Sequence, residues 1–259
     1  MNPTEEFAAL VSTPEGFPLD RAALLVAKHA RPDLEVGREL ARIDDLAEQV
    51  RQPTLDGLTR LLFDELGFRG DQRNYYDPAN SYLDAVLDRR SGIPITLSII
   101  TREVGRRIGV PLAYVGMPGH FLLQDRVDRS IYVDPFHRGA RLSIDACEQI
   151  FRTLHGSDAA FDPSLVAETS SIATLARLLN NLKALFSRDR DLSSLAWVLH
   201  LRTLVPGIGD YERQALSQVL AGLGQFSAAA DQLDILAANN PEERSTLEAS
   251  AHRLRARLN

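Results

Sequence analysis

Two short segments of the sequence place a histidine and an aspartate where they can act together. HFLLQ and SIYVD are predicted strands that form a hairpin over a loop at residues 125–129. In the register centred on Val127, His120 and Asp134 lie directly opposite each other, with Cβ atoms about 4.5–5.5 Å apart. A carboxylate in that position fixes the tautomer of the imidazole and stabilises the imidazolium, which is the arrangement of a general base.

The same alternation assigns the two faces of this hairpin. The apolar face comprises Phe121, Leu123, Ile131 and Val133. The other face comprises His120, Gln124, Ser130 and Asp134. A slip of one residue would mix the two sets. The sequence therefore predicts the histidine and the aspartate on the polar face of a small antiparallel sheet.

A general base acts on a nucleophile, and Cys147 is one candidate because it is the only cysteine of the chain. A thiol beside a His–Asp pair would ionise readily and attack well. Its segment, SIDACEQIFRTL, places it on one helical face with Ile144, Ile150 and Phe151. Small buried cysteines are common in protein cores, and this pattern favours a core position for Cys147.

The second candidate position for a nucleophile is the start of a helix predicted at residues 96–108. Thr96 and Ser98 place hydroxyl groups near the positive end of that helix. Structural roles are also open to both residues, since Thr96 can be the helix N-cap and Ser98 a small packing residue. A hydroxyl there would need direct proton removal by His120 and a site that stabilises an oxyanion.

A metal-ligand pattern occurs in the same region. His120, Asp134 and His137 are residue types that bind divalent cations. Asp134 and His137 are three residues apart on a strand that leads into a turn, and we expect this spacing not to converge two ligands as a helix would. The sequence has no glycine-rich phosphate-binding motif. We therefore expect neither a metal ion nor an organic cofactor.

The elements that must position these residues form three blocks. Residues 18–92 are predicted to be helical, because aliphatic residues recur there at spacings of three and four. Residues 92–140 contain one helix and then three short strands, LAYVGM, HFLLQ and SIYVD. Residues 141–258 return to helix. The sequence therefore predicts an α+β fold, with a helical N-terminal region, a small antiparallel sheet and an all-α region after it.

The last block contains an internal repeat of 34 residues. RDRDLSSLAWVLHLRTLVPG and GLGQFSAAADQLDILAANNP superpose at that offset, with Leu192 on Phe226 and Leu199 on Leu233. Thirty-four residues is the period of the tetratricopeptide helix–turn–helix repeat. A plain helical bundle with chance periodicity is the alternative. A capping helix is predicted at residues 242–258.

Composition limits the classes of partner. The chain has 259 residues and a formal net charge of -6, so it has no overall field for nucleic acid. No window approaches 18 consecutive apolar residues, and the N-terminus lacks the basic region of a secretory signal. With one cysteine and no disulfide, we expect a cytoplasmic protein that contacts neither nucleic acid nor membrane.

Three motifs give the sequence a resemblance to a known family. They are GIPITLS at residues 92–98, GMPGHF at residues 116–121 and YVDPFHRG at residues 132–139. From about residue 35 to its end the sequence resembles the bacterial transglutaminase-like family with C-terminal tetratricopeptide repeats, often called the SirB family. The resemblance implies a transglutaminase-like (papain-like) domain at residues 1–165 and tetratricopeptide-like repeats at residues 166–259.

The resemblance also implies roles for individual residues. In the wider transglutaminase-like superfamily, a helix N-terminus supplies a catalytic cysteine, and two following strands supply a histidine and an aspartate. His120 and Asp134 match the histidine and the aspartate by that resemblance. The cysteine belongs near residues 94–98, where this chain has none. Cys147 follows both other residues in the chain and does not match by order.

Three hypotheses for function follow from the retained pair and the missing thiol. The first is a non-catalytic module that binds a protein or peptide partner through the helical repeats, with His120 and Asp134 as the remnant of a Cys-His-Asp triad. The second is a hydrolase or acyl transferase that uses Ser98 or Thr96 with His120 and Asp134. In the third, the pair is a structural hydrogen bond only.

Overall fold

The structure is a computed structural model that describes residues 2–13 and 16–258. The chain divides into two compact units, one of residues 16–178 and one that combines residues 1–15 with residues 179–259. Helix α8 (Ser171–Asp189) contributes its first part to the former unit and the remainder to the latter. The domain boundary predicted between residues 165 and 166 stays a prediction.

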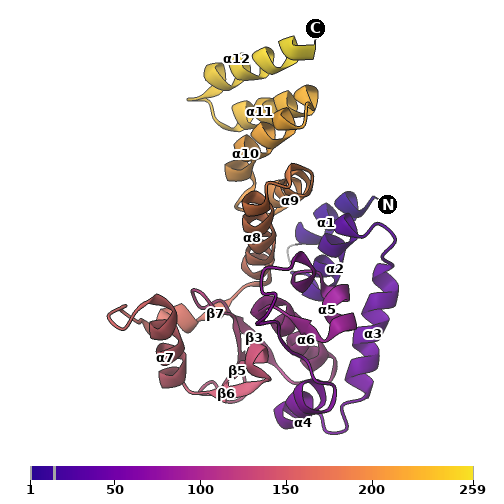
Figure 1. Ribbon diagram of the computed structural model, residues 1–259, viewed down its shortest axis with the longest axis vertical. Helices are drawn as coiled ribbons and strands as arrows, with labels where there is room; N and C mark the ends of the chain where they lie inside the picture. The colour runs from indigo at the N-terminus through magenta and orange to yellow at the C-terminus, as the bar shows by residue number, and fades with distance from the viewer. Residues whose placement is uncertain (1, 14–15, 259) are drawn as a thin grey trace. The chain divides into compact units, whose positions relative to one another are not determined.

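The unit of residues 16–178 contains a sheet and helices (Figure 1). Its complete α-helices are α2 (Leu19–Ala30), α3 (Val36–Glu48), α4 (Leu55–Thr59), α5 (Leu83–Arg89), α6 (Pro94–Arg107) and α7 (Ile144–His155). A π-helical segment, η1 (Arg60–Glu65), continues α4, and the short 3-10 turns are η2 (Pro78–Asn80), η3 (Pro135–His137) and η4 (Pro163–Val166). Together these elements confirm the α+β class.

The main sheet of this unit is antiparallel and has the strand order β6-β5-β4-β3-β7. Its strands are β3 (Leu112–Val115), β4 (Leu122–Asp125), β5 (Tyr132–Asp134), β6 (Ala140–Leu142) and β7 (Glu168–Thr169). The short strands β1 (Arg69–Gly70) and β2 (Ser91–Gly92) form a separate parallel pair. The sequence predicted β3, β4 and β5, whereas β6 and β7 are too short to show an alternating pattern.

The predicted register of the β4–β5 hairpin is wrong by two residues. Leu123 pairs with Val133 and Gln124 with Tyr132, so His120 is not opposite Asp134 in the ladder. The loop lies one residue later than predicted, at residues 126–130, because a backbone bond of 3.0 Å from the N–H of Asp125 to the carbonyl of Ile131 closes it. A slip of two residues preserves the alternation, so each side chain stays on its predicted face.

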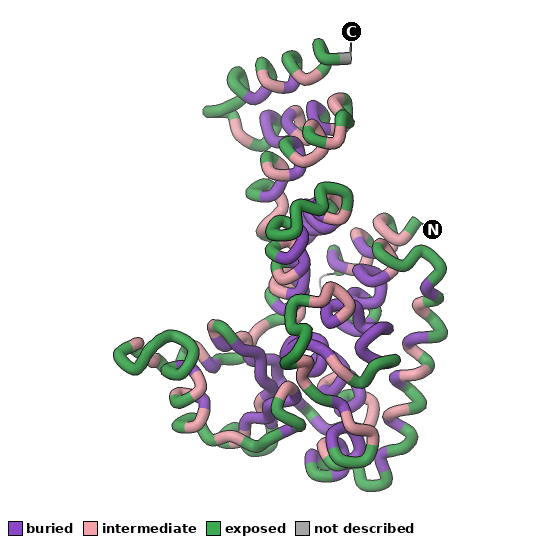
Figure 2. Tube along the Cα trace, viewed as in Figure 1, coloured by how far each residue is buried: buried purple, intermediate pink, exposed green. Residues whose placement is uncertain are grey.

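Both faces of the sheet are covered, which differs from the predicted polar face. Helix α6 packs against β3 and β4. On the other face, Leu122 and Tyr132 belong to a buried cluster with Cys147 and Phe151 of α7. The tube in Figure 2 is accordingly buried along the strands and α6. The functional side chains therefore lie at the end of a buried hairpin.

Helix α6 begins at Pro94, two residues before the predicted start. Proline suits the first helical position because its missing N–H would have no partner there. The helix is buried over most of its length, with Leu97, Ile100 and Val104 among its buried residues. Its N-terminus is thereby fixed inside the unit, next to the end of the hairpin.

The other unit is entirely helical among its described residues. It contains α1 (Pro3–Val11), the end of α8, α9 (Leu192–Leu204), α10 (Gly209–Gly222), α11 (Phe226–Asn239), α12 (Arg244–Arg255) and the 3-10 turn η5 (Ala256–Leu258). Each helix from α9 to α12 packs against the next. Helices α9 and α11 begin 34 residues apart, in agreement with the repeat, and its assignment to the tetratricopeptide class stays a prediction. Within the described residues, no helix combines the length and hydropathy needed to cross a bilayer.

Candidate functional site

His120 and Asp134 meet at the open end of the hairpin. His120 lies in the turn before β4, where its N–H donates to the carbonyl of Met117 (3.1 Å). Asp134 ends β5 and caps the turn η3. The Nε2 atom of His120 is 2.8 Å from Oδ2 of Asp134, and both side chains are buried. The predicted juxtaposition therefore exists, although the residues meet diagonally across the end of the ladder and not as an opposed pair.

His137 joins this pair, which corrects the expectation from its spacing. Because η3 turns immediately after the strand, the Nδ1 atom of His137 comes within 2.7 Å of Oδ2 of Asp134. Ligand atoms of His120, Asp134 and His137 all lie within 4.8 Å of one another. The side chain of His137 is about half exposed, whereas the other two are buried. The three residue types are those of a divalent-cation site.

The hydrogen bonds that Asp134 accepts determine its protonation state. Its Oδ1 accepts the backbone N–H groups of Phe136 (3.0 Å) and His137 (3.2 Å), and Oδ2 accepts both imidazoles. Burial acts to raise the pKa of Asp134, but the hydrogen bonds and charges of His120 and His137 outweigh it and hold that pKa below its usual value. Asp134 is thus ionised at neutral pH and orients both rings.

Arg177 of α8 holds the turn that carries His120, and sequence reasoning missed it. Its guanidinium donates to the carbonyls of Met117 (2.9 Å) and His120 (2.7 Å). It also lies over the ring of Phe121, 5.3 Å from the centroid. Arg177 is 57 residues from His120 in the chain, so only the folded structure could reveal the contact. It positions His120 through the backbone.

A cleft of about 900 Å³ opens beside the cluster. Tyr75, Tyr76 and Phe136 form an aromatic wall, in which edge-to-face contacts join Tyr75 to both neighbours (5.3 and 6.0 Å between centroids). The ring of His120 meets Phe136 edge to face at 6.1 Å. Residues of α7, including Leu154, complete the lining. This wall too was not predicted from the sequence.

The hydroxyls proposed as nucleophiles do not reach His120. Thr96 is fully buried, and its Oγ1 donates to backbone carbonyls, with Asn80 at 2.8 Å and Ile93 at 3.1 Å. Ser98 is also fully buried, and its Oγ has no hydrogen-bond partner among the described residues. Of residues 94–98, the one that lines the cleft with His120 is Pro94. At the start of α6, the residue that lines the cleft is therefore a proline, which carries no nucleophilic group.

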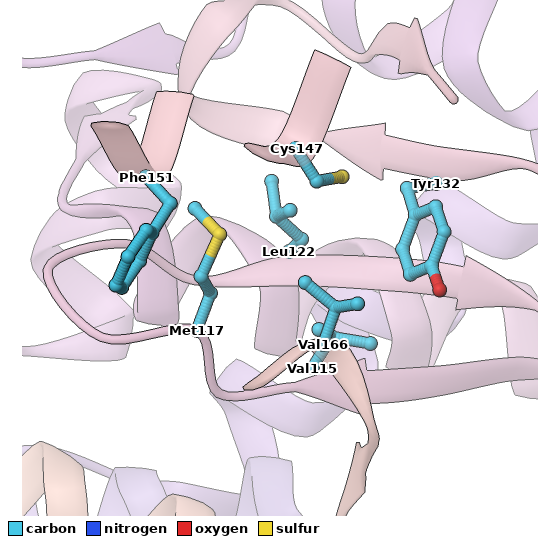
Figure 3. Close-up of a cluster of buried hydrophobic side chains, with 7 residues drawn as sticks. All are labelled: Val115, Met117, Leu122, Tyr132, Cys147, Phe151 and Val166. Carbon is cyan, nitrogen blue, oxygen red and sulfur yellow. The ribbon is translucent and has the colours of Figure 1, made fainter. Parts of the chain in front are cut away.

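Cys147 lies in the core, as its helical pattern predicted. It is fully buried in a cluster with Val115, Leu122, Tyr132 and Phe151, whose side chains Figure 3 shows. Burial, and secondarily the charge of Asp134, raise the pKa of its thiol to about 11. A thiol of that pKa is protonated at neutral pH and unreactive.

A scan of protein families matches residues 27–180 to the transglutaminase-like superfamily. The chain belongs to the transglutaminase-like superfamily. A UPF0162 protein of Xylella fastidiosa is 36% identical over 186 residues, which are 67% of this chain and 66% of that protein. A UPF0162 protein of Pseudomonas aeruginosa is 30% identical over 208 residues, 76% of each chain. The chain thus spans slightly under two thirds of the Xylella relative. No solved structure matches it.

A part of the transglutaminase-like domain also resembles a eukaryotic protein. The F-box only protein 21 of Mus musculus is 38% identical over 112 residues, which are 39% of this chain and 18% of that protein. The likeness to bacterial proteins supports a bacterial family for the whole domain. The transglutaminase-like domain of this chain therefore combines a His120–Asp134 pair with a helix start that carries no thiol.

Proposed function

We propose that this transglutaminase-like domain binds a peptide segment of a partner protein in the cleft beside His120 and does not cleave or transfer it. The observation that supports the proposal is which residues at the start of α6 line the cleft. Pro94 lines the cleft with His120, while the hydroxyls of Thr96 and Ser98 are buried away from any bond to the imidazole. A base without a nucleophile does not form a covalent intermediate.

The cleft has the composition of a peptide-binding surface. Three of the exposed large apolar side chains of the chain, Tyr75, Tyr76 and Leu154, line it, with exposed fractions of 39%, 66% and 51%. Tyrosines are enriched in interfaces because they combine apolar area with a polar end. The imidazoles and the Asp134 carboxylate add fixed polar groups at the base of the cleft. Apolar walls with a few fixed polar groups suit an extended peptide.

The helical unit is proposed to supply a second contact with the same partner. A pocket of about 720 Å³ lies among α10, α11 and α12, where Gln218, Leu233 and Leu254 contribute to its walls. Stacked helix pairs of this kind form extended binding surfaces in repeat proteins. This part of the proposal rests on the 34-residue repeat and on the packing of consecutive helices.

Selection of peptides on the full chain tests the proposed binding site. A displayed library of random peptides is panned on the protein, and the affinity of enriched peptides is measured by calorimetry. In Thr153→Trp a bulky ring enters the cleft from the exposed face of α7, and we expect it to weaken binding at least tenfold. Asp145→Trp adds the same ring to α7 outside the cleft and serves as the matched control.

The outcomes of this selection separate the hypotheses. Peptides that bind equally well to Thr153→Trp and to the unaltered chain would show that the cleft is not the binding site. Peptides that are recovered cleaved, as seen by their mass, would show that the domain is a hydrolase. Loss of binding in Thr153→Trp, retention in Asp145→Trp and an intact peptide together are the result expected of a non-catalytic binding cleft.

One observation keeps an enzyme as the second candidate. The His120–Asp134 bond of 2.8 Å is the orienting half of a base, and the buried Oγ of Ser98 has no partner among the described residues. A hydrolase or acyl transferase would need that hydroxyl, or the one of Thr96, to lie against the imidazole in the open cleft. Neither hydroxyl lines the cleft, which favours binding over catalysis.

A further inference from the structure

A second, polar pocket of about 740 Å³ adjoins the aromatic cleft. Gln72, Phe136 and His137 line both cavities, so the two lie side by side at these residues. The side chains that distinguish the polar pocket are those of Arg69, Arg73 and Arg138. They come from β1, from the loop after it and from the residue that ends η3.

These three arginines have no ionic partner in the part of the chain that the structure describes. None of their guanidinium groups makes an ion pair or a hydrogen bond among the described residues, and all three residues are exposed. Other arginines of the same domain do reach a carboxylate, as Arg89 does with Asp77 (3.0 Å). An unpaired guanidinium that faces a pocket keeps all its N–H donors available to a ligand.

The charge of the pocket is positive in an acidic chain. Asp71 is the only carboxylate that lines it, and one oxygen of that carboxylate accepts the N–H of Asn74 at 2.9 Å. Three guanidinium groups therefore outnumber one carboxylate, although the whole chain carries a net charge of -6. The positive potential is thus local to this pocket and does not arise from the overall field.

The backbone that carries the pocket is held in place. Arg69 and Gly70 pair with Ser91 and Gly92 in the parallel β1–β2 ladder. The ring of Phe136 lies so close over Gly70 that a Cβ there would be 2.4 Å from the ring. The backbone at Arg69 and Gly70 is therefore held against the turn that carries His137 and Arg138, so the three arginines line one cavity.

From these observations we infer that the arginine pocket binds a carboxylate of the peptide that occupies the cleft: an acidic side chain or the peptide's C-terminus. The inference rests on the proposed peptide-binding function and assigns its specificity. Guanidinium groups bind carboxylates through paired N–H donors, and three of them around one cavity suit one or two such groups. A phosphate has the same recognition chemistry, so the test must separate the two sources.

Two matched peptides test the inference on the full chain. One has two leucines followed by two glutamates with both ends blocked, and the other has glutamines in place of the glutamates. We expect the glutamate peptide to bind about tenfold more tightly. The triple variant Arg69→Gln, Arg73→Gln, Arg138→Gln should abolish that preference. The double variant Arg51→Gln, Arg129→Gln removes two other exposed, unpaired arginines outside the pocket and should retain it.

Other outcomes distinguish a failure of this inference from a failure of the proposed function. If both peptides bind equally and the cleft-blocking Thr153→Trp weakens both, the cleft binds peptides and the arginine pocket is not its specificity site. If library peptides fail to bind at all, the proposed function fails. The pocket is then judged by the arginine Nε signals in a nuclear magnetic resonance titration with succinate. Saturable shifts at Arg69, Arg73 and Arg138, absent at Arg51, support it, and their absence overturns it.

Three further ligands test whether the pocket prefers a carboxylate to other anions. A phosphoserine version of the acidic peptide or inorganic phosphate that binds more than tenfold more tightly than the glutamate peptide would overturn the assignment to carboxylate. Tighter binding of a short single-stranded oligonucleotide would overturn it as well. Because the substituted side chains make no ion pair or hydrogen bond among the described residues, we expect the triple variant to keep the thermal stability of the unaltered chain, and circular dichroism checks this.

Discussion

Asp134 accepts four hydrogen bonds, and its two oxygens divide them between backbone and side chains. Oδ1 takes the backbone N–H groups of η3, which hold the carboxylate, while Oδ2 takes His120 and His137. Since a carboxylate only accepts, both imidazoles donate an N–H group to it. The carboxylate thereby sets the orientation of both rings.

Asp134→Asn tests the electrostatic role of this carboxylate. We expect the variant to lose about 1–3 kcal/mol of unfolding free energy at pH 7, because the amide replaces a charged acceptor of a buried network. The pKa of Asp134 is lowered by folding, so its ionised form contributes stability above the unfolded pKa of about 3.9. That contribution is lost as the pH falls through the lower folded pKa.

The difference in unfolding free energy between Asp134→Asn and the unaltered chain should therefore become smaller below about pH 4. Urea unfolding at a series of pH values measures it. A gap of constant size from pH 7 to pH 3 would show that the charge of Asp134 does not act as described.

Pro94→Cys tests whether the cleft still supports an activated thiol. In a Cys147→Ala background, the new thiol stands at the first position of α6, on the wall it shares with His120. The helix N-terminus and the imidazole both favour a thiolate. We expect iodoacetamide to alkylate it at pH 7 about tenfold faster than an ordinary exposed thiol, and His120→Ala to remove the acceleration.

Ser98→Cys in the same background is the matched control, because position 98 is fully buried and off the cleft. It should resist alkylation in the folded protein. Equal rates at the two positions would contradict the placement of Pro94 in the cleft.

At the scale of elements, the turn of residues 116–121 is fixed from α8. Arg177→Lys removes the fork that bridges the carbonyls of Met117 and His120, because an ammonium group does not span both as a planar guanidinium does. We expect a loss of about 1–3 kcal/mol and at least tenfold faster hydrogen exchange at the His120 amide. Arg152→Lys on exposed α7 should leave that amide unchanged.

The ion cluster of the helical unit should be costly to break. The buried carboxylate of Glu212 accepts Arg202 and Lys183, each at 2.7 Å. Burial acts to raise its pKa, but these bonds and charges lower it overall. Glu212→Gln removes the buried carboxylate charge that Arg202 and Lys183 contact, and we expect a loss of about 3–5 kcal/mol in unfolding free energy.

Arg255→Gln breaks the exposed pairs with Asp231 and Asp234 and should leave the stability almost unchanged, because solvent screens these charges. Thermal unfolding of the three proteins compares the losses. A similar small loss in both variants would contradict a stabilising role of the buried cluster.

Sequence reasoning predicted the strands of the site better than the loops, turns and long-range contacts that bring its residues together. Alternation gave the hairpin and its two faces, because a side-chain period of two is visible in a few residues. It could not give the position of the loop, which depends on the bond from Asp125 to Ile131. Nor could it give the turn η3, which brings His137 onto Asp134, or the reach of Arg177. These depend on contacts between residues that no local period connects.

At the scale of the whole molecule, two features limit its function. The chain is acidic overall, yet three arginines without an ion pair among the described residues line the pocket beside the cleft. Its transglutaminase-like domain retains an oriented imidazole, yet the helix start offers proline and buried hydroxyls. Both features suit a chain that holds a peptide without attacking it.

The central claim is that no nucleophile stands at His120, and the intact mass of the full chain after incubation with a fluorophosphonate tests it most directly. Such probes react with serine and threonine hydroxyls that a neighbouring base activates. We predict an unchanged mass at neutral pH. A stoichiometric adduct that maps to Ser98 or Thr96 and disappears in His120→Ala would contradict the account and make the domain an enzyme.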